Sequence, residues 1–92
     1  MKVIVKAFAT FRKILENEKE VECPEGTTIG GLVEMLIAER PALRDAIYAA
    51  PGVLQDHVTV LRNGRNVYFE KGLQTVVADR DVVSLFPPVG GG

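Results

Sequence analysis

One helical segment separates two groups of strand-like segments, and this order restricts the topologies open to the chain. Thr28 stands where an N-cap belongs, ahead of apolar residues at helical spacing. These residues are Ile29, Leu32, Val33, Leu36 and Ile37. Because Pro41 ends the pattern, the sequence predicts a helix of about three turns over residues 28–40. Gly30 and Gly31 weaken its first turn, and close packing of the helix on a sheet would explain them.

Alternating, β-branched segments lie on both sides of this helix. The strands expected before it span residues 2–8 and 19–23 and form a hairpin. The strands expected after it span residues 58–61, 66–69 and 82–86. Asn63-Gly64, a strong signal for a two-residue hairpin, joins the first two of these. Strand parity places Val3, Val5 and Ala7 on one face of the first strand and Ile4, Lys6 and Phe8 on the other.

Shorter elements are expected between these segments. Phe11, Ile14 and Leu15 predict a short apolar turn. A second short helix is expected from the spacing of Leu43, Ala46, Ile47 and Tyr48, before the break at Pro51-Gly52. A polar loop that includes Asp79, Arg80 and Asp81 leads into the last strand.

The crossover helix requires the strand pairs on either side of it to share one mixed sheet. The sequence therefore predicts an α+β protein with the β-grasp, ubiquitin-like fold. Its four- to five-stranded mixed sheet packs on one main helix, with a short second helix. We expect one β-grasp domain over residues 1–86, followed by a flexible tail over residues 87–92.

The composition excludes several classes of function. Eleven Lys and Arg face twelve Asp and Glu, spread without a basic cluster, so nucleic acid is not an expected partner. No segment is apolar enough to cross a bilayer, and the expected location is the cytoplasm. The single Cys23 cannot build a multi-cysteine metal site, the single His57 has no second His or Cys close by in sequence, which argues against a ligand or triad role, and no phosphate-binding loop is found. We expect no metal, no cofactor bound by this chain and no catalytic apparatus of its own.

The end of the chain carries the strongest functional signal. Directly after the apolar strand come Pro87, Pro88, Val89, Gly90, Gly91 and Gly92. Because glycine has no Cβ, such a tail can lie extended in a channel too narrow for other residues, with the α-carboxylate at its far side. Glycine-rich termini are also common without a function. Here the glycines follow at once on a predicted strand and a stiff proline pair, which favours a substrate for another enzyme.

Three segments together resemble the ubiquitin-like sulfur carrier family. They are residues 57–64, residues 81–85 and the Phe-Pro-Pro-Val-Gly-Gly-Gly ending. The resemblance covers essentially the whole chain and is strongest to the small subunit of molybdopterin synthase and the small archaeal modifier proteins. It implies that a ubiquitin-activating-type enzyme, using magnesium ATP, adenylates the carboxylate of Gly92 and that sulfur from a persulfide displaces AMP. The product is a C-terminal thiocarboxylate.

The resemblance leaves two fates for the activated terminus. It donates sulfur to a pterin precursor in the large subunit of molybdopterin synthase, or it forms an isopeptide bond with lysines of target proteins, or one protein does both, as the archaeal relatives can. Gly90 stands where ubiquitin has a basic residue, which favours the sulfur carrier. In the first case the chain would count as an enzyme only as the small, sulfur-donating subunit. A β-grasp binding module without covalent chemistry is the third alternative.

Strand parity also predicts a partner-binding surface beside the tail. If Val58, Val60, Val83 and Leu85 face the helix, the opposite face carries Thr59, Leu61, Ser84 and Phe86. Leu61 and Phe86 would form an apolar patch on which a partner docks, unless either packs under residues 65–80. Arg62 and Arg65 could steer an acidic partner, although charges at a hairpin tip are more often simply solvated.

Overall fold

The computed structural model describes residues 1–88, so residues 89–92 of the predicted tail lie outside it. Its strands are β1 Lys2–Ala7, β2 Glu18–Glu22, β3 Tyr48–Ala50, β4 Val53–Leu54, β5 Thr59–Arg62, β6 Arg65–Asn66 and β7 Val82–Phe86. The helices are α1 Ile29–Glu39 and α2 Leu43–Ile47, with 3-10 turns η1 Ala9–Lys13, η2 Val67–Phe69 and η3 Gly72–Gln74.

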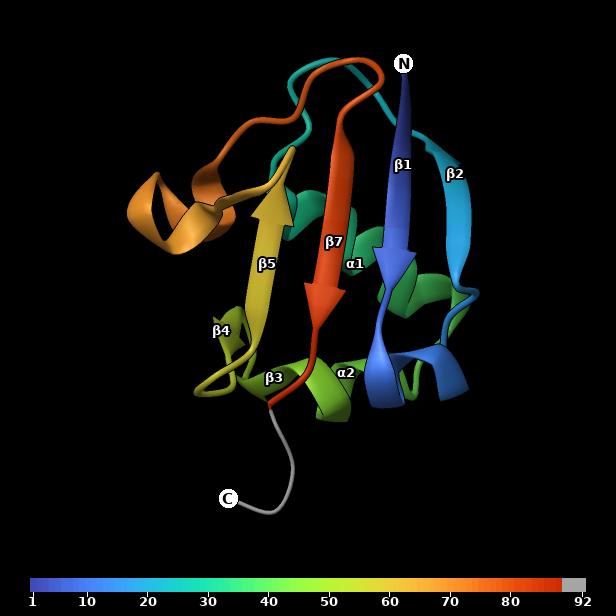
Figure 1. Cartoon of the computed structure of the whole chain (residues 1–92), viewed down its shortest axis with the longest axis vertical. Helices are drawn as coiled ribbons and strands as arrows, with labels where there is room; N and C mark the ends of the chain where they lie inside the picture. The colour runs from blue at the N-terminus through green and yellow to red at the C-terminus, as the bar shows by residue number, and fades with distance from the viewer. Residues whose placement is uncertain (89–92) are drawn as a thin grey trace.

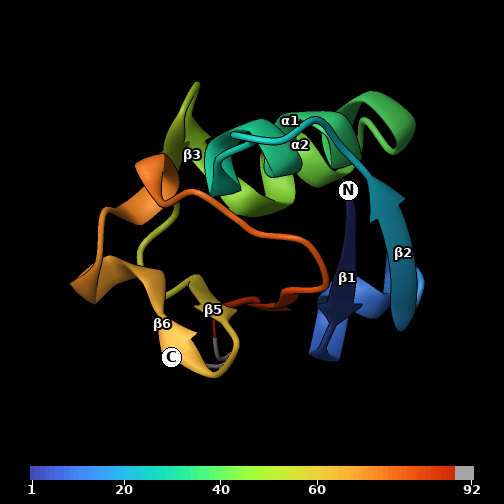
Figure 2. The same cartoon turned by 90° about the horizontal axis from the view of Figure 1, so that it is seen from above.

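Five strands form one mixed sheet in the order β2-β1-β7-β5-β6 (Figure 1). The two central strands, β1 and β7, are parallel, and the other neighbours are antiparallel. Figure 2 shows α1 and α2 together on one face of this sheet. The predicted α+β, β-grasp architecture is therefore confirmed: a mixed sheet, one main helix and one short helix.

The core lies between the sheet and α1, as the alternation of the strands predicts. Val3, Val5 and Ala7 of β1 are buried, and so are Val83 and Leu85 of β7. The side of α1 that meets them buries all five predicted apolar residues, Ile29, Leu32, Val33, Leu36 and Ile37. Since each such side chain contributes roughly 1.5–3 kcal/mol on burial, the match between the two periodicities accounts for the packing of helix on sheet.

Local signals in the sequence place the boundaries of two elements correctly. The hydroxyl of Thr28 accepts a hydrogen bond from the Gly31 amide at 3.0 Å and caps α1, which ends at Glu39. Asn63 and Gly64 both have positive φ, at 51° and 85°, as a two-residue hairpin turn requires. This turn sets the register of β5 against β6.

Two boundary predictions after α1 are wrong. The short strand expected over residues 66–69 is only Arg65–Asn66, and the chain then enters the 3-10 turn η2. The reason is local, because the side chain of Asn66 accepts a hydrogen bond from the Tyr68 amide and Val67 turns into the core. Tyr48 does not extend α2. It begins a small β3-β4 hairpin around Pro51-Gly52 that the sequence pattern did not indicate.

The close approach at Gly30 comes from η3 and not from the sheet, which corrects the explanation given for the two glycines. A Cβ on Gly30 would stand 3.2 Å from the carbonyl oxygen of Leu73 and 3.3 Å from its Cβ. At Gly31 the nearest atoms, on Thr27 and Thr28, are 3.5 Å away, which is ordinary contact.

These distances predict different outcomes for two neighbouring substitutions. Gly31→Ala is expected to raise the free energy of unfolding by about 0.5–1 kcal/mol, the difference in helix propensity. Gly30→Ala is expected to lose that gain, because the backbone of the η3 segment must move away. Chemical denaturation of both variants checks this, and equal stabilisation by both would contradict the close approach.

No helix among residues 1–88 is both long enough and apolar enough to span a membrane.

Candidate functional site

Strand β7 carries the chain to the candidate site, the root of the predicted tail. It lies between β1 and β5, so both of its edges are hydrogen-bonded. The hydrogen bonds between β7 and β1 continue one residue beyond the end of β1, where the Phe8 amide donates to the Leu85 carbonyl at 3.1 Å. Pro87 is buried and Pro88 half-buried directly after it. The chain therefore leaves the middle of the sheet from a firmly held position.

Two stacked rings lie at this point. The ring of Phe86 packs on that of Phe8, with centroids 4.4 Å apart and planes inclined by 9°. The guanidinium of Arg12 lies over the ring of Phe8, 5.2 Å from its centroid, and Nε of Arg12 donates to the Ala7 carbonyl at 3.0 Å. Phe86 is the last residue before Pro87, so this stack restrains the direction in which the tail begins.

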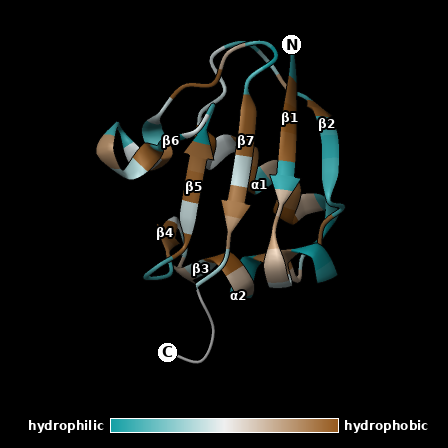
Figure 3. Ribbon diagram, in the orientation of Figure 1, coloured by the Kyte–Doolittle hydropathy of each residue, from teal (hydrophilic) through white to brown (hydrophobic). Residues whose placement is uncertain are grey.

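The predicted partner-binding residues of β5 and β7 lie on the face that α1 and α2 leave open. Thr59 pairs with Phe86, and Leu61 pairs with Ser84, so all four belong to one face of the sheet. All four are half-buried, whereas Val60, Val83 and Leu85 on the other face are buried. Figure 3 shows apolar residues along the central strands and polar residues along β2. The proposed docking role of these residues stays a prediction.

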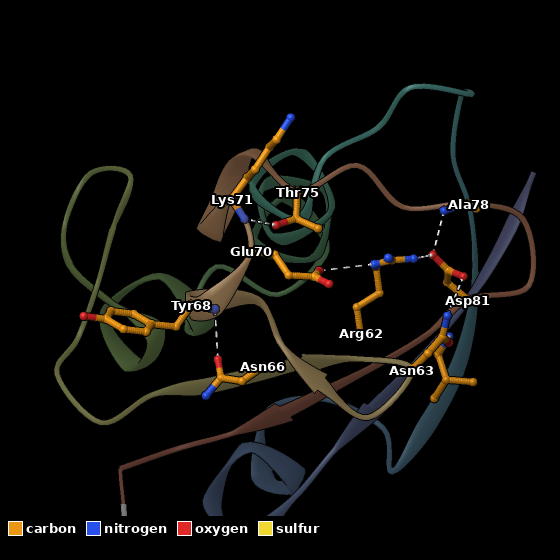
Figure 4. Close-up of polar contacts among 10 residues, drawn as sticks. Arg62, Asn63, Asn66, Tyr68, Glu70, Lys71, Thr75, Ala78 and Asp81 are labelled. Carbon is orange, nitrogen blue, oxygen red and sulfur yellow. Dashed lines mark hydrogen bonds and ion pairs between the residues drawn. The ribbon is translucent and has the colours of Figure 1, made fainter.

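Arg62 lies apart from this group. It pairs with Val83 in the ladder and therefore belongs to the helix-facing side, near the start of β7. Its Nη1 donates to Oδ2 of Asp81 at 2.9 Å, and its Nε lies 3.8 Å from Oε1 of Glu70 (Figure 4). The guanidinium is thus engaged within the chain, which favours a structural role over contact with a partner.

Asp81 is the centre of this polar cluster and is only 7% exposed. Its carboxylate also accepts hydrogen bonds from the Ala78 amide at 2.7 Å and from Nδ2 of Asn63 at 2.8 Å. Burial raises the pKa of Asp81, but these hydrogen bonds and the Arg62 charge outweigh it and hold the pKa below its ordinary value. The cluster joins the β5-β6 turn to the first residue of β7, since Oδ1 of Asn63 also accepts from the Val82 amide.

A cleft of about 610 Å³ adjoins the tail root. Phe86, Pro87 and Pro88 form one side of it. Ala9, Thr10, Phe11 and Ile14, together with Ala46 and Gln55, supply the rest. The cleft is mostly apolar and lies beside the last described residues of the chain.

Sequence reasoning missed several residues of this site. It placed Phe8 on the outward face of its strand but did not connect it with Phe86. Parallel pairing of the first and last strands would have been the signal, because it makes the two rings neighbours. Ala46 and Gln55 reach the cleft from segments distant in sequence, and no local pattern indicates this.

The remaining predicted site residues, Val89, Gly90, Gly91 and Gly92, lie outside the described part of the chain. Among residues 1–88, no three His, Cys, Asp or Glu side chains gather closely enough to hold a metal ion. Cys23 is buried.

Comparison of the sequence with known proteins identifies relatives along the entire chain. The profile of the ThiS family matches residues 5–92. Small archaeal modifier protein 3 of Haloferax volcanii is 36% identical over the full length of both chains. Sulfur carrier protein CysO of Mycobacterium tuberculosis is 31% identical, again over the full length of both.

Solved structures agree with these sequence matches. The crystal structure of SAMP1 from Haloferax volcanii superposes with a TM-score of 0.87 at 31% identity, and the match covers 100% of both chains. A chain in the crystal structure of the Amycolatopsis orientalis BexX/CysO complex superposes with a TM-score of 0.78 at 26% identity, covering 98% of this chain and 99% of that one. With its β-grasp fold and the match over residues 5–92, the chain belongs to the ThiS family of ubiquitin-like sulfur carriers and modifiers.

Proposed function

We propose that this protein is a sulfur carrier whose C-terminal residue, Gly92, is adenylated and then thiocarboxylated by a partner enzyme. The observation that supports this most strongly is the junction at Phe86. A doubly paired central strand ends there in two packed prolines, and the sequence continues with one valine and three glycines. The folded domain holds the start of the tail in place, and the glycines that follow have no bulky side chains. Such a tail can carry its terminal carboxylate into a narrow active site of another protein.

The chemistry needs little from this chain beyond a reachable carboxylate. A carboxylate oxygen of Gly92 attacks the α-phosphorus of ATP in the partner, and pyrophosphate leaves. A persulfide sulfur then attacks the acyl carbon, and AMP leaves with the bonding electron pair. A thiol cleaves the sulfur-sulfur bond of the resulting acyl persulfide, which releases the thiocarboxylate and leaves a disulfide on the partner. The partner supplies magnesium ATP, the persulfide and the thiol.

The tail-root surface is the part of the chain proposed to dock on the activating enzyme. The stack of Phe8 and Phe86 and the open-face residues Leu61, Thr59 and Ser84 border the point where the tail begins. A partner that covered them would hold the body while the tail enters its active site. A CysO protein of Amycolatopsis orientalis has been crystallised in complex with BexX, which is consistent with a carrier that works in complex with a partner protein.

The proposed acceptor of the sulfur is a pterin precursor in the large subunit of a molybdopterin synthase. This step rests on the resemblance of the Phe-Pro-Pro-Val-Gly-Gly-Gly ending to the small subunit of that enzyme. Its test is sulfur transfer from the thiocarboxylated chain to such a subunit, followed by loss of the thiocarboxylate.

The experiment that tests the function is the intact mass of the protein purified from its own cells without a C-terminal tag. The expected result is a species heavier than the unmodified chain by the replacement of one oxygen with sulfur, located at Gly92 by fragmentation. Incubation with an alkylating reagent serves as the control when fragmentation locates the added group, because a thiocarboxylate at Gly92 reacts and a carboxylate does not, whereas alkylation of the free thiol of Cys23 is recognised by its position. Unmodified protein alone, under conditions where the activating enzyme is expressed, would count against the proposal.

A second candidate function is protein modification through an isopeptide bond from Gly92 to lysines. It is favoured by the 36% identity to small archaeal modifier protein 3. Conjugates that survive boiling and reductant, and that carry Gly92 on a lysine of another protein, would support it. A binding module without covalent chemistry would show neither modification, and a tag added after Gly92 would not affect it.

A further inference from the structure

The end of strand β7 is held at two points by one residue that follows the neighbouring strand, Phe8. The Phe8 amide donates to the Leu85 carbonyl at 3.1 Å, and the Phe8 ring stacks on that of Phe86 with centroids 4.4 Å apart. In Figure 1 the C-terminal ends of β1 and β7 lie side by side. The conformation of Phe8 therefore acts directly on the direction in which Phe86 leaves the sheet.

Arg12 in turn holds Phe8 and the backbone before it. The guanidinium lies over the Phe8 ring, 5.2 Å from its centroid, and Nε donates to the carbonyl of Ala7, the last residue of β1, at 3.0 Å. A planar guanidinium can make both contacts at once, because its donors form a rigid fork and its charge is delocalised. An ammonium group acts only as a point charge. Arg12 therefore fixes both the backbone that leads into Phe8 and the ring itself.

A strained turn returns Arg12 to this position. Ala9 has a φ of 52°, in the left-handed region that residues with a Cβ rarely adopt. The Phe11 amide closes the turn by donating to the Phe8 carbonyl at 3.1 Å, and the Phe11 side chain is buried. Such backbone conformations persist only where the surrounding structure imposes them, and they concentrate at functional sites.

The two prolines after Phe86 carry its direction onward. A proline ring fixes φ of its own residue and restricts the residue before it to extended conformations, so Phe86 and Pro87 have little torsional freedom. Pro87 is also buried, and Pro88 is half-buried. The three glycines at the end of the sequence cannot supply a direction, since glycine adopts most backbone conformations readily. Any direction given to the tail is therefore set at its root.

We propose that Arg12 is a positioning residue for activation of the chain. It holds Phe8 against Phe86 and thereby directs the start of the tail toward the active site of the activating enzyme once the folded domain has docked. Arg12 acts through Phe8 and not on the reacting carboxylate. This role rests on the proposed function, activation at Gly92, and adds a residue outside the tail on which that reaction depends.

A positioning role predicts which kinetic constant changes. Docking of the folded domain governs KM, whereas placement of the carboxylate after docking governs kcat. A variant without the Arg12 contacts docks as before, but fewer of its docked chains place the carboxylate correctly. We expect Arg12→Gln to lower kcat for adenylation about tenfold and to change KM by less than about twofold. A direct contact between Arg12 and an acidic group of the enzyme would raise KM instead.

Isotope exchange between pyrophosphate and ATP, with the untagged full chain and the cognate activating enzyme, measures both constants. Lys13→Gln is the matched control, because it removes the same charge from an exposed neighbouring residue of η1. Its constants are expected to equal those of the wild type. Arg12→Lys keeps the charge but cannot make both contacts, so its kcat is expected to fall nearly as far as that of Arg12→Gln.

A double-mutant cycle with Phe8→Leu tests whether Arg12 acts through Phe8. Phe8→Leu removes the ring and keeps the amide that donates to Leu85. In this background we expect Arg12→Gln to lower kcat less than about twofold, because the ring on which Arg12 acts is already absent. The ring-proton shifts of Phe8 and Phe86 report the stack in the free chain without any enzyme. We expect these shifts to change in Arg12→Gln and not in Lys13→Gln.

The outcomes separate this role from the proposed function. No exchange with the wild type would contradict activation at Gly92 and, with it, any role of Arg12 in that reaction. Exchange by the wild type, with the same constants in Arg12→Gln, would overturn the positioning role alone. A rise in KM without a fall in kcat, an equal loss in Lys13→Gln or a wild-type kcat in Arg12→Lys would also overturn it, since each assigns the effect to charge. Additive effects in the cycle, or unchanged ring shifts in Arg12→Gln, would show that Arg12 does not act through Phe8.

Discussion

Removal of Gly91 and Gly92 is expected to abolish adenylation of the chain while leaving its free energy of unfolding unchanged. The truncated chain ends at Gly90, so its carboxylate stops short of the activating enzyme's catalytic centre by about 7 Å of extended backbone. A misplacement of even 1 Å can cost about a hundredfold in rate, so no residual activity is expected. Isotope exchange between pyrophosphate and ATP, with the cognate activating enzyme, measures this first step directly.

Stability should not change, because the hydrophobic core is complete before the tail begins. Its buried residues run from Val3 in β1 to Leu85 in β7. Thermal unfolding of the truncated chain therefore serves as the control. A chain extended beyond Gly92 by a short tag provides a second control, because it keeps both glycines but has no free carboxylate there. Adenylation of either variant at the wild-type rate would refute the role assigned to Gly92.

Asp81→Ala is expected to lower the free energy of unfolding by roughly 2–4 kcal/mol, the largest stability effect of a single polar substitution that we predict. The substitution removes the acceptor for Nη1 of Arg62, Nδ2 of Asn63 and the Ala78 amide at once. It leaves a partly buried cation without its nearest carboxylate. Urea denaturation checks the magnitude, with Asp56→Ala, at an exposed position, as the matched control.

The same carboxylate predicts the direction of an acid effect. Because the folded state holds the pKa of Asp81 below its ordinary value, its ionised form stabilises the fold above the pKa of the unfolded chain, near 4. This contribution is lost as the pH falls below that value and the carboxylate becomes protonated. The stability of the wild type should thus fall more steeply than that of Asp81→Asn in this range. Parallel curves for the two proteins would contradict the assignment.

Much of the fold could be predicted because its main signals are local. The period of apolar residues after Thr28 identifies α1, and the alternation in β1, β5 and β7 identifies strands and their buried faces. Asn63-Gly64 identifies the hairpin because few residues adopt positive φ at both positions of such a turn. The outward face shared by Leu61 and Phe86 follows from the same alternation.

The predictions that were wrong involve competition between weak local preferences and long-range packing. Residues 66–69 have the composition of a strand, but burial of Val67 and the hydrogen bond from the Tyr68 amide to Asn66 favour a 3-10 turn. The contact between Gly30 and Leu73 joins residues more than forty positions apart, so no local pattern could reveal it. The same holds for Ala46 and Gln55 in the cleft.

The amino-acid sequence therefore predicts the order of elements, the faces of the strands and the glycine tail as the candidate reactive end. Each of these depends on residues within a few positions of one another. Three other features depend instead on how strands and turns distant in sequence meet. They are the stack of Phe8 on Phe86, the hydrogen bond from Arg62 to Asp81, and the cavity between residues 54–60 and residues 66–72. Their positions follow from the register of β1 and β5 against β7, and that register is established only when the sheet closes over α1.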